Sequence, residues 1–307
     1  MITIISKFAV MRTILSRGMA VLAALGLGIS GCGTADGSNE GAPRIVVTTN
    51  ILGDVVRHLV GNEAKVEVIM PPNADPHDFA PSPKQAVAMR RADLLVVNGG
   101  GFEAGLVDTI RAAEADGATV VTATEEVALL GNDPHVFTSP ANMVVIAEAV
   151  AVRLVMEVPA LDTPSYRAQV EGYVAELRAL DSEIETLLRV VPLDHRVLVT
   201  NHDVFGYFAE RYDFEILGAV IPAGSTLAEP SAKDIRGLAS VIAAAGVPAI
   251  FADTSASTRV AAALAGEGTN VEVVELFSES VGEPGSDGDT YVHLMRTNAQ
   301  RIAAALG

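Results

Sequence analysis

The 307-residue chain contains a single cysteine, Cys32. One cysteine excludes a disulfide within the chain, and it also excludes a metal site built from thiolates. Half of the residues are apolar, which is enough to bury one or two ordinary globular cores. The length of the chain favours two domains.

Basic residues are also scarce, with 21 Lys and Arg against 38 Asp and Glu. Three of the basic residues, Lys7, Arg12 and Arg17, lie in a first segment of 31 residues that contains no acidic residue, so the rest of the chain is more acidic still. An acidic surface without a cluster of Lys and Arg repels phosphate backbones and releases no counterions from them. We therefore expect no binding to nucleic acid. An acidic surface favours cations as ligands instead.

The N-terminal apolar stretch, from Met19 to Ile29, is too short for a transmembrane helix, which needs about 20 such residues. It follows basic residues and precedes small ones, as in an export signal. The run Ile29-Ser30-Gly31-Cys32 resembles a bacterial lipoprotein box, in which the cysteine becomes the lipidated first residue. We expect a cleaved signal peptide over residues 1–31, a lipid on Cys32, and a flexible tether over residues 32–43.

From Arg44 onward, short runs rich in β-branched residues alternate with amphipathic segments. This alternation is typical of parallel sheets covered by helices. The expected strands lie at 44–48, 65–70, 93–97 and 118–122, and again at 196–200, 214–220, 248–252 and 271–276. Between the two sets, Thr163 and Pro164 open a long helix whose apolar residues recur every three or four positions. The sequence predicts two α/β lobes, over 44–160 and 192–307, joined by one helix over 161–191.

Three of the six histidines lie in loops that directly follow expected strands, namely His77, His135 and His202. Open parallel sheets bind ligands beyond the carboxyl ends of their strands, so these three side chains should lie near one another. Two of them follow Asp-Pro, and the proline restricts the backbone just before the imidazole. The other histidines, His58, His195 and His293, occupy settings typical of structural or solvated histidines.

An oxygen donor should complete a metal site, because thiolates are excluded. Asp289 follows the last strand and opens the final helix, and we prefer it, although aspartate there is also a common N-cap. Asp287 and Glu283 are the alternatives in the same loop. Three neutral imidazoles and one carboxylate suit Zn²⁺, Mn²⁺ or Fe²⁺. Because the donors come from both halves, binding should draw the lobes together, and affinity should fall below a pH of about 6.5 as the imidazoles become protonated.

Several segments resemble, in order, the zinc/manganese-type substrate-binding proteins of bacterial ABC transporters. They are NILGDVVRHLVG, DPHDFAPSP, DLLVVNGGGFE, DPHVFTSPAN, TNHDVFGYFAERY and GDTYVHLMRTN, and the resemblance runs from about residue 44 to residue 307. It implies two Rossmann-like lobes joined by a rigid backbone helix, with one zinc or manganese ion at the lobe interface. The ligands carried over by the resemblance are His77, His135, His202 and Asp289.

The resemblance also implies a monomer, anchored by lipid on the extracytoplasmic face of the membrane, that delivers its metal to an ABC permease. Many zinc-dedicated members carry a long histidine-rich loop before the second ligand. This loop is absent here, so the resemblance does not restrict the metal to zinc. Glu103, Asn142 and Asp203 lie within or beside these segments and are candidates to orient the imidazoles through hydrogen bonds. The sequence offers nothing against an additional role in cell adhesion or metal buffering.

The main alternative is a zinc-dependent hydrolase, in which the three histidines hold the ion and a water takes the fourth position. The sequence lacks H-E-x-x-H and G-x-S-x-G, and a carboxylate ligand would fill the place of the water. A dinucleotide site at Gly99-x-Gly101-x-x-Ala104 is a weaker alternative, because these glycines follow the third strand instead of the first. A tight turn that brings Phe102 and Glu103 to the cleft explains the glycines better, and we expect a binding protein, not an enzyme.

Overall fold

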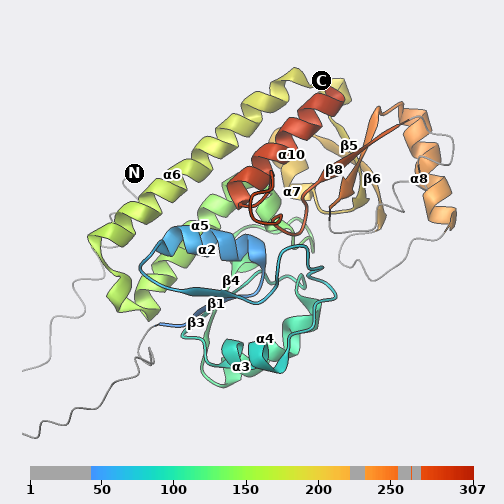
Figure 1. The fold of residues 1–307 in the computed structure, drawn as a ribbon. Helices are drawn as coiled ribbons and strands as arrows, with labels where there is room; N and C mark the ends of the chain where they lie inside the picture. Colours follow the sequence, from blue (N-terminus) through green and yellow to red (C-terminus); the bar gives the residue numbers. More distant parts are fainter. Residues whose placement is uncertain (1–42, 222–231, 255–263, 265–270) are drawn as a thin grey trace, which may run out of the picture. The chain divides into compact units, whose positions relative to one another are not determined.

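Two parallel four-stranded sheets form the framework of the protein (Figure 1). The computed structural model describes residues 43–221, 232–254, 264 and 271–307. The first sheet has the order β2-β1-β3-β4 and the second the order β6-β5-β7-β8. We call the parts of the chain around them the N-lobe and the C-lobe. The strands are β1 (Ile45–Val47), β2 (Val66–Val68), β3 (Leu94–Val97), β4 (Thr119–Thr122), β5 (Val197–His202), β6 (Glu215–Ile221), β7 (Ala249–Asp253) and β8 (Glu272–Leu276).

Every neighbouring pair of strands is parallel, as the alternation of the sequence predicted. The central strands β1 and β3 are buried along their whole length, whereas the edge strand β2 is partly exposed. This difference is expected where helices cover both faces of a parallel sheet and only its edges approach solvent. The α/β fold class is therefore confirmed, while the lobe boundaries at residues 160 and 192 stay a prediction.

Helices follow the strands in both lobes. The α-helices are α2 (Asn50–Val60), α3 (Pro83–Arg90), α4 (Val107–Ala115), α5 (Pro140–Glu157), α6 (Pro164–Leu187), α7 (Gly206–Tyr212), α8 (Ala232–Ala245) and α10 (Tyr291–Leu306). The short 3₁₀ turns are η1 (Ala104–Leu106), η2 (Ala123–Glu126), η3 (Val136–Thr138), η4 (Pro159–Leu161), η5 (Leu188–Val190) and η6 (Leu193–His195). Among the described residues, no helix combines the length and the apolar character needed to cross a bilayer.

The long helix α6 spans both lobes, as predicted, over 24 residues. Thr163 caps its first turn by accepting a hydrogen bond from the Tyr166 N–H, and Pro164 occupies the first helical position. One stripe of the helix is buried, and it contacts α2 and α5 of the N-lobe and α10 of the C-lobe. Arg296 of α10 is tied to Glu183 of α6 by two hydrogen bonds of 2.7 and 2.9 Å. The helix therefore packs against helices of both lobes and connects them.

Residues 1–42 lie outside the described part of the chain. The expected signal peptide, Cys32 and nearly all of the tether fall in this segment, so they stay predictions.

Candidate metal centre

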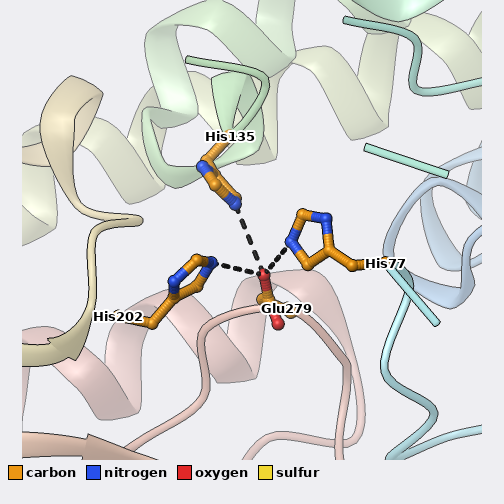
Figure 2. A group of neighbouring side chains, drawn as sticks. All are labelled: His77, His135, His202 and Glu279. Carbon is orange, nitrogen blue, oxygen red and sulfur yellow. Dashed lines mark hydrogen bonds and ion pairs between the residues drawn. The ribbon is translucent and has the colours of Figure 1, made fainter. Parts of the chain in front are cut away.

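Three imidazoles and one carboxylate meet beyond the carboxyl ends of the strands. His77 lies in the loop after β2, His135 lies just before η3, and His202 is the last residue of β5. Glu279 follows the end of β8 by three residues. Figure 2 shows these four side chains pointing toward a common centre, two from each lobe. The expectation that the strand ends bring the three histidines together holds.

The Nε2 atoms of the three imidazoles surround one oxygen of Glu279. Its Oε1 lies 2.8 Å from His77 Nε2, 3.3 Å from His135 Nε2 and 3.2 Å from His202 Nε2. One donor atom from each of the four residues lies within 4.8 Å of all the others. Donors around a tetrahedral zinc ion, bound at about 2.0–2.2 Å, lie roughly 3.3–3.6 Å apart. Small shifts would therefore allow the four donors to enclose an ion.

The centre is almost completely shielded from solvent. The three histidines are at most 2% exposed and Glu279 is 4% exposed. Phe102 lies edge-on to both N-lobe imidazoles, with ring centroids 5.2 Å from His77 and 5.4 Å from His135. An apolar wall of this kind excludes water and strengthens the electrostatic attraction between the donors and a cation.

The glycine-rich turn after β3 presents Phe102 to the centre, as the sequence predicted. Gly99 and Gly101 have φ values of 82° and 86°, in the left-handed region that glycine tolerates. The buried Glu103 carboxylate accepts hydrogen bonds from the N–H groups of Asn98 and Gly99, at 2.5 and 2.9 Å. Burial raises the pKa of Glu103 in spite of these bonds. Glu103 thus stabilises the turn through backbone hydrogen bonds. The expectation that it orients a histidine is corrected.

The charges at the centre stabilise one another. Burial disfavours the imidazolium form of His135, but hydrogen bonds to Asp133 and Glu279 outweigh burial and raise the pKa of His135 to about 9. Burial also disfavours the Glu279 carboxylate, but its contacts with His135, His202 and His77 hold the pKa of Glu279 well below its usual range. The carboxylate is therefore charged and attracts a cation, either a proton held on an imidazole or a metal ion.

The comparison with known proteins agrees with this geometry. The family model described as zinc-uptake complex component A, periplasmic, matches residues 45–305. The chain belongs to this family. It is 30% identical to the zinc-binding protein TroA of Treponema pallidum over 288 residues, which cover 89% of this chain and 92% of TroA. It is 25% identical to the manganese ABC transporter substrate-binding lipoprotein PsaA of Streptococcus pneumoniae over 304 residues, covering 94% of this chain and 97% of PsaA.

Two solved structures share the fold. The structure of the periplasmic zinc-binding protein TroA has a TM-score of 0.79 and 29% identity, and the match covers 87% of this chain and all of TroA. A manganese-bound periplasmic metal-binding protein of Candidatus Liberibacter asiaticus has a TM-score of 0.76 at 20% identity, covering 86% of this chain and 99% of that protein. At that identity, the second likeness concerns the fold alone.

Asp289 was expected to be the fourth ligand, and this expectation is corrected. Its carboxylate does not face the imidazoles. Its Oδ1 accepts a hydrogen bond from His293 Nδ1 at 2.8 Å, and its Oδ2 accepts one from the Gly285 N–H at 2.9 Å. Glu279 takes the fourth position instead. A signal for it was present in the sequence, because Glu279 lies in the loop after β8, at the carboxyl end of a parallel strand, just as His77 and His135 lie in the loops after β2 and β4.

The other competitors for the fourth position also lie apart from the imidazoles. Glu283 accepts a hydrogen bond from Asn73 Nδ2 at 3.1 Å, and Asp287 is an exposed partner of Arg301 at 3.7 Å. The histidines outside the centre have separate contacts as well. His58 stacks on the ring of Tyr173, and His293 pairs with Asp289.

Asn142 and Asp203 were also expected to orient imidazoles, and they differ from one another in position. The Asn142 amide donates to the Val136 carbonyl at 3.4 Å and thereby supports η3. Burial raises the pKa of Asp203, as does the nearby charge of Asp133, while the charges of His135 and His202 lower it. Asp203 is therefore close to the centre. The residue that does orient an imidazole is Asp133, whose Oδ1 accepts a hydrogen bond from His135 Nδ1 at 2.6 Å.

Proposed function

We propose that this chain is the extracytoplasmic substrate-binding protein of a bacterial ABC importer and that it carries one divalent transition-metal ion, zinc or manganese. The observation that supports this most directly is the convergence of three Nε2 atoms on the buried Glu279 carboxylate. The names of the relatives agree with it, because TroA is named as a zinc-binding protein and PsaA as a manganese transporter component. Three nitrogen donors and one oxygen donor also accept Fe²⁺.

The proposed binding step replaces water with protein donors. An incoming ion exchanges its water ligands for His77, His135, His202 and Glu279, and His135 gives up a proton because only a neutral imidazole binds a metal. Since two donors belong to each lobe, the ion favours the arrangement in which the lobes approach one another. The closed protein is then the form that meets the permease.

The proposal includes the N-terminal segment. We expect that residues 1–31 are removed, that Cys32 carries the lipid, and that residues 32–43 allow a monomeric domain to reach the permease. The lipoprotein box supports this, and relatives such as PsaA are named as lipoproteins.

The hydrolase alternative is not favoured by the position of Glu279. A catalytic zinc site keeps one coordination position open for a water molecule. The Glu279 carboxylate lies where that water would bind, at 2.8–3.3 Å from all three Nε2 atoms. We therefore expect no hydrolysis of ester or phosphate substrates by the metal-loaded protein.

The test is the metal content of the protein. Purified without chelator and analysed by elemental analysis, it should hold one ion per chain, and competition between Zn²⁺ and Mn²⁺ then measures the preference. His77→Ala and His202→Ala should lose most of the binding. His58→Ala is the matched control, because that ring stacks on Tyr173 away from the centre, and it should bind like the wild type. A wild-type protein without metal, or unchanged binding by His77→Ala, would contradict the proposal.

A further inference from the structure

The three imidazoles of the centre are supported unequally. His135 Nδ1 donates to Asp133 Oδ1 at 2.6 Å, whereas His77 Nδ1 and His202 Nδ1 are buried without a hydrogen-bond partner among the described residues. A metal-binding imidazole usually donates its second N–H to a carboxylate or carbonyl group, and that bond sets the tautomer and the direction of the ring. Of the three imidazoles, His135 is therefore the one whose second ring nitrogen is held by a hydrogen bond in this structure.

The two Asp-Pro-His tripeptides of the N-lobe make this difference clear. In both, the aspartate Oδ1 accepts a hydrogen bond at 2.9 Å from the backbone N–H of the histidine two residues later. Only in Asp133-Pro134-His135 does the same oxygen also reach the ring. The tripeptide alone therefore does not orient an imidazole, and an additional contact must hold Asp133 in place.

That additional contact comes from the other lobe. Tyr207, on α7 of the C-lobe, donates its hydroxyl proton to the Asp133 carbonyl at 2.8 Å and accepts a hydrogen bond from the Leu130 N–H at 3.0 Å. Tyr207 is 2% exposed and both bonds are partly buried, which limits competition from water. They close the loop of residues 130–135 onto α7, the helix that follows His202.

Gly206, the first residue of α7, allows this close approach. A Cβ atom on Gly206 would lie 2.6 Å from Asp133 Oδ2, so a larger residue would push the carboxylate away. A third bond joins the same surfaces, from the Thr138 hydroxyl to the Val204 carbonyl at 3.4 Å. The carboxylate of Asp133 thus lies between an N-lobe ligand and a C-lobe helix.

We propose that Tyr207 and Asp133 form a cross-lobe latch that orients His135 only while the lobes are together. This inference rests on the proposed function and deepens it. When the lobes separate, the two bonds of the Tyr207 hydroxyl break, the loop of residues 130–135 loses its support, and His135 loses its fixed direction. The latch therefore slows release of the ion from the closed protein, and both residues are positioning residues that do not touch the ion.

The experiment compares two hydroxyl deletions on the same helix. Full-length wild type, Tyr207→Phe and Tyr212→Phe are loaded with Zn²⁺, and the rate of zinc transfer to an excess of chelator is followed by stopped flow. Tyr212 is the matched control, because its hydroxyl donates to Asp181 of α6 at 2.9 Å. Tyr207→Phe should release zinc about tenfold faster, within the 10–100-fold range that supporting residues of metal ligands show. Tyr212→Phe should release zinc at the wild-type rate.

A second pair of variants tests the link to the imidazole. Asp133→Ala removes the bond to the ring and should weaken zinc affinity about 10–100-fold. Asp75→Ala removes the equivalent aspartate beside His77, whose Nδ1 it does not bind, and should weaken affinity less. The ¹⁵N signal of His135 Nδ1–H in the zinc-loaded protein should change in Asp133→Ala and in Tyr207→Phe, but not in Tyr212→Phe. A loss of packing alone would not produce this pattern.

The possible failures are distinguishable. If the wild type binds no zinc, the proposed function fails. If the wild type binds zinc and Tyr207→Phe releases it at the wild-type rate, or if Tyr212→Phe accelerates release equally, the latch is wrong. If Tyr207→Phe does not fold, the Asp133→Ala variant tests the inference instead. Wild-type zinc affinity together with an unchanged His135 signal in Asp133→Ala would overturn it.

Discussion

The segment between β8 and α10 contains two stretches that differ in how they are held. Residues 277–281 carry Glu279 and are buried, whereas residues 282–290 carry Asp289 and are partly exposed. The first stretch is fixed from outside. Asn298 of α10 bonds both the N–H and the carbonyl of Phe277, at 2.9 and 2.6 Å, and Asn50 of the N-lobe accepts a hydrogen bond from the Val281 N–H at 2.9 Å.

The second stretch is fixed mainly by its own backbone. The Gly282 N–H donates to the Gly288 carbonyl at 2.8 Å, and the Ser286 N–H donates to the Glu283 carbonyl at 3.0 Å. Its carboxylates contact partners other than the imidazoles, namely Asn73 for Glu283, Arg301 for Asp287 and His293 for Asp289. The carboxylate that lies beside the imidazoles is thus the one whose backbone is bonded to both lobes, and a position on the same loop is not sufficient.

The largest expected effect comes from the donor itself. Glu279→Gln keeps the shape of the side chain but removes its charge, so three imidazoles face a neutral amide. Zinc affinity should fall by more than about 100-fold, beyond the range seen for residues that only support a ligand. Isothermal titration with Zn²⁺ measures this, and affinity within about threefold of the wild type would mean that Glu279 is not a ligand.

The pH dependence should be the next largest effect, and its two parts have opposite signs. Because the pKa of His135 is raised from about 6.5 in the unfolded chain to about 9, its ion pairs stabilise the metal-free fold below a pH of about 6.5. That stabilisation is lost as the pH rises through about 9. Metal affinity should increase over the same window, by about tenfold per pH unit where one proton leaves for each ion.

This window lies above the one expected from an unperturbed histidine, where affinity falls only below a pH of about 6.5. Zinc titrations and thermal unfolding of the metal-free protein, both from pH 6 to pH 9, provide the check. An affinity that is flat across this range would contradict the raised pKa of His135.

A smaller effect is expected from the residue that ties the Glu279 stretch to the N-lobe. Asn50 Nδ2 donates to Ser280 Oγ and to the Pro71 carbonyl, both at 2.9 Å. Asn50→Ala leaves the buried Val281 N–H without its acceptor, which should cost about 1–3 kcal/mol of folding stability. Zinc affinity should fall about tenfold, because Glu279 is less well placed. Unchanged affinity together with reduced stability would limit Asn50 to a structural role.

The smallest effect is expected at Asp289. Asp289→Asn removes the charge of a partly exposed carboxylate, and the hydrogen bond from His293 holds the pKa of Asp289 below its usual value. Exposed ion pairs of this kind contribute little, so zinc affinity should stay within about a factor of two of the wild type. A loss as large as that of Glu279→Gln would restore Asp289 as the donor and remove the contrast between the two stretches.

Much of the fold was predictable because it depends on local patterns. The β-branched runs predicted the strands. The capping residue Thr163, followed by Pro164 at the first helical position, predicted the start of α6. The three histidines were predictable because each follows a strand end, and parallel strands of one sheet end at the same edge.

The remaining site residues depend on contacts between distant parts of the chain. The backbone near Glu279 is bonded to Asn50, more than 200 residues earlier in the sequence. Asp133 reaches the ring of His135 while its loop is held by Tyr207, 74 residues later. No periodicity in the sequence reports contacts of this kind.

The central claim is that one ion is held by His77, His135, His202 and Glu279. Diffraction from crystals of the zinc-loaded protein, recorded at the zinc absorption edge, locates the ion directly. We expect a single anomalous peak at about 2.0–2.2 Å from the three Nε2 atoms and from a Glu279 carboxylate oxygen. A peak coordinated by Asp289, or one that lacks Glu279 among its ligands, would contradict it.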